Sequence, residues 1–162
     1  MKTSFKPMSY DHCEGIMNIY NWYIENSLAA YPDKIKSNDY FSHFMNATKG
    51  YPAFTIFSDD EIVGFCFLRP YMPHTTFNET AEITYFIKDQ FTGKGLGKLA
   101  LEKLEEGAKA SGIKYILASI SSENLYSISF HMKNGFQECG RFGKIITKNG
   151  KQFDIVWMQK NL

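Results

Sequence analysis

Three glycines at alternate positions stand where a strand-like segment becomes a helix-like one, and this junction restricts the fold more than any other feature. The strand-like segment is TAEITYFI at 80–87, which is rich in β-branched and aromatic residues. The glycines follow in QFTGKGLGK at 90–98, and apolar residues then recur at helical spacing up to Gly112. A strand, a turn and a helix in direct succession are typical of α/β domains. We therefore expect an α/β fold built around this junction.

The rest of the chain adds strands and helices on both sides of the junction. Its length, 162 residues, is usual for one domain, so we expect a single domain over residues 1–162. The predicted order is β-α-α-β-β-β-α-β-α-β-β, which implies a mixed central sheet with helices on both faces. On the helix after the glycines, the residues expected to be buried are Leu96, Leu99, Ala100, Leu104 and Ala108. The predicted strands are 3–7, 53–58, 62–69, 80–87, 114–120, 136–146 and 152–159, and the predicted helices are about 10–27, 37–50, 96–112 and 125–133.

Charge and composition argue against several classes of partner. Lys and Arg total 18 against 17 Asp and Glu, so the net charge of +1 offers no basic excess for nucleic acid. No stretch approaches the roughly 18 apolar residues that span a bilayer, and the N-terminus lacks the apolar core of a signal peptide. The three cysteines are widely spaced, and neither they nor the histidines have metal-ligand spacing. We expect a cytoplasmic protein with reduced thiols and without a metal, nucleic acid or membrane partner.

The glycine segment is suited to hold a phosphate group. Glycines let an anion approach the backbone, and the N–H groups at a helix N-terminus favour negative charge. A nucleotide P-loop needs GxxxxGK[ST], but Lys98 is followed by Leu99. A dinucleotide-binding turn needs GxGxxG and an acidic residue about 20 positions later, which this segment and ILASIS at 116–121 do not supply. Another phosphate ligand remains, and the alternative is a glycine-rich helix entry that binds nothing.

Two motifs resemble the signatures of the GNAT N-acetyltransferases. In that family a [Q/R]-x-x-G-x-[G/A] turn binds pyrophosphate, and TGKGLG at 92–97 is similar to it. Thr92 stands where Gln or Arg is usual, although the frame that begins at Gln90 also fits. NLYSISFHMKNGF at 124–136 is similar to the family's pattern N-x-x-[A/S]-x-x-x-[Y/H]-x-x-x-G-[F/Y]. The segments that resemble the phosphinothricin acetyltransferase-like branch are IYNWYI at 19–24, TAE at 80–82 and FDIVWMQ at 153–159.

The resemblance implies a fold, a co-substrate and an assembly. In the GNAT fold the fourth and fifth strands, here 80–87 and 114–120, splay apart, and acetyl-CoA lies in the cleft between them. A backbone N–H of the fourth strand would polarise the thioester carbonyl. The branch implies amino-acid-like acceptors of the phosphinothricin or methionine sulfoximine type, and a homodimer. The residues that we assign to acetyl-CoA are Tyr85, Phe86, Ile87, Thr92, Gly93, Lys94, Gly95, Leu96, Gly97, Lys98, Asn124 and Ser127.

Glu82 is the first candidate for a catalytic residue. Strand alternation places it on one face with Thr84 and Phe86, opposite Ile83 and Tyr85, within an otherwise apolar segment. A carboxylate in that position must face a polar group. It is either a general base for the acceptor ammonium or a solvated or paired strand carboxylate. The branch that this sequence resembles assigns the glutamate of its Ala-Glu pair as the base, which favours the catalytic role.

His131 is the second candidate. It occupies the position where many GNAT members have a tyrosine near the CoA sulfur, and imidazole titrates close to neutrality. It is expected either to protonate the leaving thiolate, to pair with Glu82, or to be a packed helix histidine. Asn124 has two compatible roles, a contact to CoA and a helix cap.

The acceptor site is expected near the loop 70–79. Arg69 ends the strand before this loop, and its guanidinium is suited to bind a carboxylate or phosphinate in a bidentate way. Tyr31, Tyr71 and Phe77 are candidates to line the pocket. The alternatives are a surface arginine and aromatic residues that only pack.

These expectations describe an acetyl-CoA-dependent N-acetyltransferase that acts by direct transfer in a ternary complex, without a metal. Two alternatives remain open. One is a non-catalytic module that senses acyl-CoA, and the other is an acetyltransferase of a protein or peptide amine.

Overall fold

The computed structural model describes residues 2–162 and contains the strands and helices in the predicted order. The largest difference from the prediction is in the second helix, predicted at about 37–50 and observed at 41–47. The last two strands are longer than predicted. Short 3-10 turns precede several elements. The strands are β1 (Thr3–Pro7), β2 (Ala53–Ser58), β3 (Glu61–Pro70), β4 (Thr80–Ile87), β5 (Tyr115–Ser121), β6 (Gln137–Lys148) and β7 (Lys151–Asn161), and the helices are α1 (Cys13–Asn26), α2 (Phe41–Ala47), α3 (Leu96–Ala110) and α4 (Leu125–Lys133).

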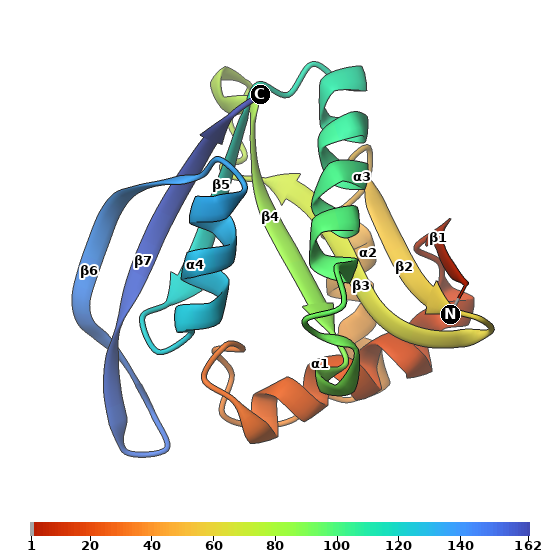
Figure 1. Cartoon of the computed structure of the whole chain (residues 1–162), viewed down its shortest axis with the longest axis horizontal. Coiled ribbons are helices and arrows are strands. Elements are labelled where there is room, and N and C mark those ends of the chain that lie inside the picture. The colour runs from red at the N-terminus through yellow and green to blue at the C-terminus, as the bar shows by residue number, and fades with distance from the viewer. Residues whose placement is uncertain (1) are drawn as a thin grey trace.

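The strands form one mixed sheet in the order β1-β2-β3-β4-β5-β7-β6 (Figure 1). All neighbours are antiparallel except β4 and β5, which are parallel. Their pairing covers only three positions, from Thr80 opposite Tyr115 to Glu82 opposite Leu117. Beyond Glu82 the two strands separate, as Figure 1 shows. The splay that the family resemblance implied therefore lies at the centre of the sheet.

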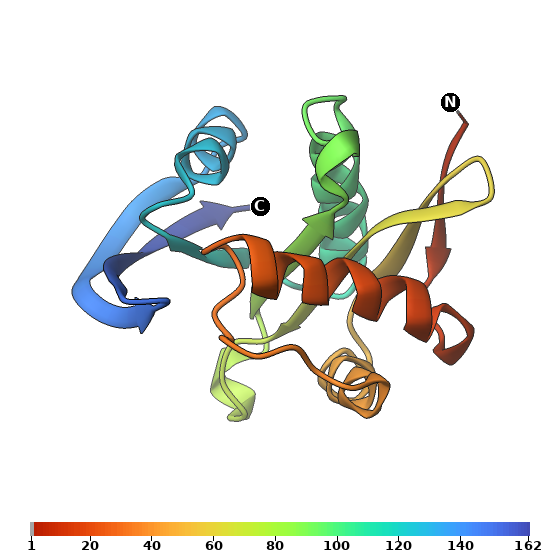
Figure 2. The same cartoon turned by 90° about the horizontal axis from the view of Figure 1, so that it is seen from below.

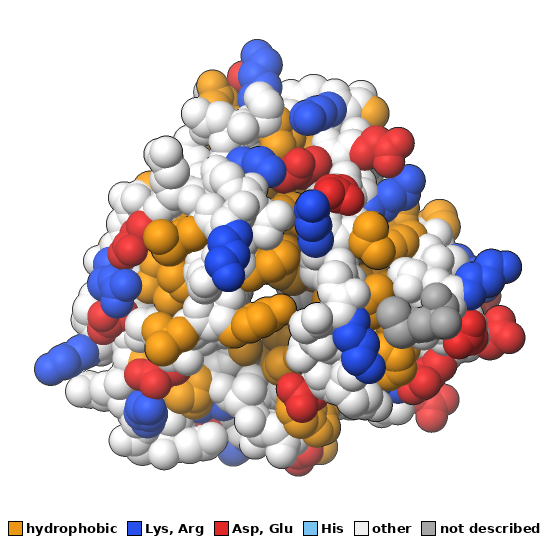
Figure 3. Space-filling view, viewed as in Figure 1, with side chains coloured by type: hydrophobic (Ala, Val, Ile, Leu, Met, Phe, Trp, Pro, Cys, Tyr) orange, Lys and Arg blue, Asp and Glu red, His pale blue; other side chains and the backbone are white. Residues whose placement is uncertain are grey.

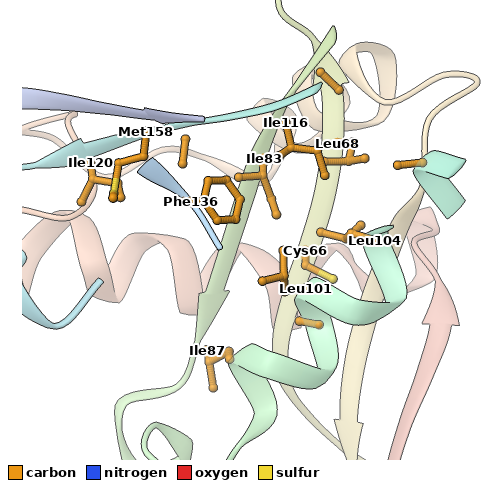
Figure 4. Packing of buried hydrophobic residues seen from close by; sticks show 14 of the residues in the cluster. Cys66, Leu68, Ile83, Ile87, Leu101, Leu104, Ile116, Ile120, Phe136 and Met158 are labelled. Atoms are coloured by element: carbon orange, nitrogen blue, oxygen red, sulfur yellow. The ribbon is translucent and has the colours of Figure 1, made fainter. Parts of the chain in front are cut away.

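Helices cover both faces of the sheet (Figure 2). On one face α1 and α2 bury an aromatic cluster that includes Phe41, Phe65 and Phe67. On the other face α3 packs Leu101 and Leu104 against the strands (Figure 4). No helix within residues 2–162 is long and apolar enough to cross a membrane.

One predicted core position on α3 is wrong. Leu99 is 45% exposed, whereas Leu101 is 2% exposed and takes part in the core. The buried stripe follows Leu96, Ala100 and Leu104, so Leu99 lies one position off this stripe and faces solvent. Helical spacing alone did not distinguish these two leucines.

Candidate active site

A cleft of about 990 Å³ opens where β4 and β5 separate. Its walls are the second half of β4, the end of β5, the glycine turn before α3, the start of α4 and the loop after α1. Figure 3 shows the surface hollowed between α4 and α3, with hydrophobic side chains at the hollow and Lys and Arg side chains beside it. The volume is in the upper part of the range of small-molecule sites. Residues on both faces of the sheet line the cleft.

The glycine turn gives this cleft an anion site. Gly93 and Gly95 have φ values of +71° and +84°, which L side chains rarely adopt. A Cβ atom at either position would meet no atom within 4 Å, so open space lies against the backbone. Gly95 is the N-cap of α3, and among residues 2–162 no side chain caps this helix. The first N–H groups of α3 therefore remain available to an anion, which fits the pyrophosphate of acetyl-CoA.

Most of the residues that we assigned to acetyl-CoA line the cleft, and two do not. Leu96 is 2% exposed and its side chain belongs to the core. Lys94 is exposed, does not line the cleft, and has its Nζ 5.1 Å from the centre of the Phe91 ring. Neither side chain therefore lines the cleft, and a contact of these two residues to acetyl-CoA through the backbone of the turn stays a prediction. The assigned residues that line the cleft are Tyr85, Phe86, Ile87, Thr92, Gly93, Gly95, Gly97, Lys98, Asn124 and Ser127.

The start of α4 forms the opposite wall of the cleft. The Oδ1 atom of Asn124 accepts a hydrogen bond from the backbone N–H of Ser127 at 3.1 Å. Asn124 is thus the N-cap of α4, one of the two roles expected for it. Its place in the cleft leaves the second role, a contact to the CoA arm, as a prediction.

Tyr85 and His131 form a hydrogen-bonded pair on the face of the sheet that carries α3 and α4. His131 is 3% exposed, and burial lowers its pKa to about 4. Its Nδ1 atom lies 2.6 Å from the Ser127 carbonyl oxygen, which can only accept, so Nδ1 carries the ring proton. The Nε2 atom is then an acceptor for the Tyr85 hydroxyl, whose pKa burial raises well above its usual range. Near neutral pH His131 is an uncharged acceptor and the Tyr85 hydroxyl holds the proton.

The low pKa of His131 predicts a loss of stability in mild acid. Between about pH 6.5 and pH 4 the unfolded state binds a proton at this ring that the folded state does not. The free energy of unfolding should therefore fall by about 2 kcal/mol from pH 7 to pH 5 through this residue alone. Urea unfolding at both pH values measures the change in the wild type and in His131→Gln. His43→Gln is the control, because His43 is exposed. An equal fall in the free energy of unfolding from pH 7 to pH 5 in all three proteins would show that folding does not lower the pKa of His131.

Glu82 and Arg69 form an ion pair on the other face of the cleft. The two residues lie opposite each other on β4 and β3, and an Nη2 atom of Arg69 lies 3.0 Å from Oε1 of Glu82. The side chains are 44% exposed for Arg69 and 15% for Glu82, so both are open to a ligand in the cleft. The expected pairing of His131 with Glu82 is wrong, because His131 bonds Tyr85 and Ser127 instead. Alternation along β4 places Glu82 and Tyr85 on opposite faces, as predicted.

The loop after α1, residues 27–32, closes this face of the cleft, and we call it the acceptor loop. The Tyr31 hydroxyl lies 2.9 Å from Oγ of Ser119 on β5, so the loop crosses the gap between the strands. Tyr31 lines the cleft as predicted, but Tyr71 and Phe77 do not. They contact each other, and the Tyr71 ring also contacts Trp157 on β7 at a centroid distance of 6.0 Å. In this structure the two aromatics pack as the alternative described, and a contact to the acceptor stays a prediction.

Sequence reasoning missed several residues of the cleft. The Tyr23 hydroxyl donates to the carbonyl of Ile87 at 2.5 Å and so ties α1 to the end of β4. Ser119 was not singled out, although polar residues at 119 and 121 interrupt the apolar pattern of β5. Nothing in the sequence marks residues 27–30 as part of the site. Within residues 2–162, no group of three or more His, Cys, Asp or Glu side chains is placed to hold a metal ion.

Comparison with known proteins gives the family. The sequence matches the acetyltransferase (GNAT) family over residues 16–136. It is 31% identical to an L-methionine sulfoximine/L-methionine sulfone acetyltransferase of Pseudomonas aeruginosa, over 100% of this chain and 96% of that protein. The fold is similar to a GNAT superfamily phosphinothricin acetyltransferase of Sinorhizobium meliloti solved with acetyl-CoA (TM-score 0.94, 24% identity, 100% of this chain and 89% of that chain). It is also similar to a ribosomal-protein-alanine N-acetyltransferase of Brucella melitensis (TM-score 0.92, 25% identity, 98% of this chain and 99% of that chain).

The family match runs from Ile16 within α1 to Phe136, the residue before β6, and so spans the elements that build the cleft. The full-length relative adds the rest of the chain. The open glycine turn and the uncapped α3 fit the co-substrate of such enzymes. The protein therefore belongs to the acetyltransferase (GNAT) family and is an N-acetyltransferase that uses acetyl-CoA.

Proposed function

We propose that the protein acetylates the primary amine of a small amino-acid-like molecule, of the methionine sulfoximine or phosphinothricin type. The observation that carries this proposal is the Arg69–Glu82 pair at the acceptor side of the cleft. An amino acid has a carboxylate and an ammonium group a few ångströms apart, and the pair offers the opposite charge to each. The similar proteins of Pseudomonas aeruginosa and Sinorhizobium meliloti, which are named for methionine sulfoximine and phosphinothricin, support the same class of acceptor.

The two faces of the sheet divide the chemistry. Acetyl-CoA supplies an activated acetyl group as a thioester. On the acceptor face, Arg69 binds the acceptor carboxylate, which releases Glu82 to take the proton from the acceptor ammonium. On the other face, the Tyr85 hydroxyl holds the proton that the leaving sulfur needs, and His131 orients that hydroxyl. The attacking nitrogen loses its second proton as the C–S bond breaks, and water relays this proton to Tyr85, which restores its hydroxyl.

The site favours a small acceptor over a protein amine. The Brucella melitensis structure carries the name of a protein N-acetyltransferase, so that alternative deserves a test. The acceptor loop and the bond between Tyr31 and Ser119 close the face from which a peptide would approach. Conversely, an acyl-CoA-sensing module would not need a base such as Glu82 in the cleft.

Calorimetric titration with acetyl-CoA, followed by a free-thiol assay with a panel of amines, tests the proposal. The panel contains methionine sulfoximine, phosphinothricin, methionine (which lacks the sulfoximine group) and a peptide whose first residue is alanine. We expect binding of acetyl-CoA and thiol release with one or more of the free amino acids. Release with the peptide alone would favour the protein amine, and binding without any release would favour the sensing module.

We also infer a cytoplasmic homodimer made of single-domain chains. The three cysteines are free thiols, as is usual for proteins of a reducing compartment. Phe142 and Ile145 on β6 are 54% and 57% exposed, and exposed apolar residues of this size are typical of contact surfaces. Sedimentation velocity at micromolar concentration tests the assembly, and a monomer would contradict it.

A further inference from the structure

A buried lysine that the proposed chemistry does not use lies at the end of β6. Lys148 is 2% exposed, although almost every other residue of β6 is exposed. Its Nζ atom donates to the backbone carbonyl of Ser27 at 2.8 Å and to that of Ala30 at 2.6 Å. Both carbonyls belong to the acceptor loop, 118 and 121 residues away along the chain. Figures 1 and 2 both place the loop after α1 beside the tip of the β6–β7 hairpin.

Hydrogen bonds to two strands thus hold the acceptor loop. The Tyr31 hydroxyl reaches Ser119 on β5 on the cleft side. On the far side, Lys148 binds two carbonyls of the loop backbone. Hydrogen bonds from an ammonium group are stronger than those between two neutral hydroxyls, and a buried ammonium without acceptors is costly. Lys148 is therefore the stronger of the two ties.

We propose that Lys148 is a positioning residue for the acceptor: it fixes the acceptor loop so that Tyr31 faces the cleft. This inference rests on the proposed function, because it takes the face with Arg69 and Glu82 as the acceptor side. Lys148 does not line the cleft and touches no reacting group. It acts only through the loop backbone. Since the glycine turn, α3 and α4 bind acetyl-CoA on the other face, the lysine should influence acceptor binding and leave acetyl-CoA binding unchanged.

The Lys148→Met variant tests this role, because methionine keeps most of the side-chain volume and removes the donors. We expect the KM for the acceptor to rise at least 10-fold, with kcat at saturating acceptor and the Kd for acetyl-CoA within twofold of the wild type. Hydrogen–deuterium exchange of the acceptor-loop amides should become faster. Lys148→Arg, which keeps a charged donor, should show a smaller rise in KM. Lys144→Met is the control, since it removes an exposed lysine from the same hairpin.

The outcomes separate the inference from the proposed function. An unchanged acceptor KM in Lys148→Met overturns the inference, whether or not exchange in the loop becomes faster. A loss of acetyl-CoA binding or of the thermal transition in that variant would assign Lys148 to folding, and would also overturn it. If the wild type acetylates none of the amino acids, the proposed function fails. In that case hydrogen–deuterium exchange still tests the inference: unchanged exchange of the acceptor-loop amides in Lys148→Met would show that Lys148 does not hold the loop, and would overturn it.

Discussion

Glu82→Gln lowers kcat by at least 100-fold if Glu82 takes the proton from the acceptor ammonium, a factor typical of a lost general base. Glutamine has nearly the same shape and keeps an oxygen that can accept from Arg69, so the change removes the basicity and little else. The Kd for acetyl-CoA should stay within twofold, because the residues proposed to bind the pyrophosphate and the leaving sulfur lie away from Glu82, at the glycine turn and on the other face of the cleft. Single-turnover kinetics with saturating acetyl-CoA measure the chemical step directly.

The control for this variant is Glu79→Gln. Glu79 is an exposed carboxylate just before β4 that is also paired with a lysine, its Oε1 lying 2.6 Å from Nζ of Lys114. It does not line the cleft, so its variant should keep the wild-type kcat. Wild-type turnover in Glu82→Gln would rule out the glutamate as the base.

The order of elements could be predicted because each carries its own local signal. Residues 80–87 and 125–133 were predicted with the bounds that the structure has, since a buried strand before glycines and a helix between Asn124 and Asn134 are well marked. The last two strands were predicted too short, because residues 147–148 and 160–161 are mostly polar and lack an apolar pattern. The family resemblance, not the spacing, located the cleft.

The partners of the site residues could not be predicted, because they depend on how distant elements meet. Glu82 faces Arg69 only because of the register between β3 and β4, and His131 meets Tyr85 only when α4 packs beside β4. A sequence shows neither register nor packing between separate elements. The same holds for Lys148, whose pattern on an exposed strand suggests a solvated residue.

Gly95→Asp should weaken the binding of acetyl-CoA by at least 100-fold. Gly95 precedes the uncapped N-terminus of α3 and has a φ of +84°, a conformation that Asp and Asn tolerate better than other side chains. The space around its missing Cβ is open, so the fold has room for the new side chain. An aspartate there can cap the free N–H groups of α3, and its charge repels the pyrophosphate that would otherwise bind them.

Gly95→Asn separates charge from shape, because asparagine has the same size, the same backbone strain and the same ability to cap the helix. We expect Gly95→Asn to weaken acetyl-CoA binding by no more than about 10-fold. The ratio of the two variants' Kd values then measures the electrostatic repulsion, and each factor of ten in this ratio corresponds to about 1.4 kcal/mol. Calorimetric titration at low and at high salt checks this, because added salt screens the repulsion and should bring the Kd of Gly95→Asp for acetyl-CoA closer to that of Gly95→Asn. If both variants bind acetyl-CoA as tightly as the wild type, the pyrophosphate does not lie at the start of α3, and the open glycine turn serves only the change of direction between β4 and α3.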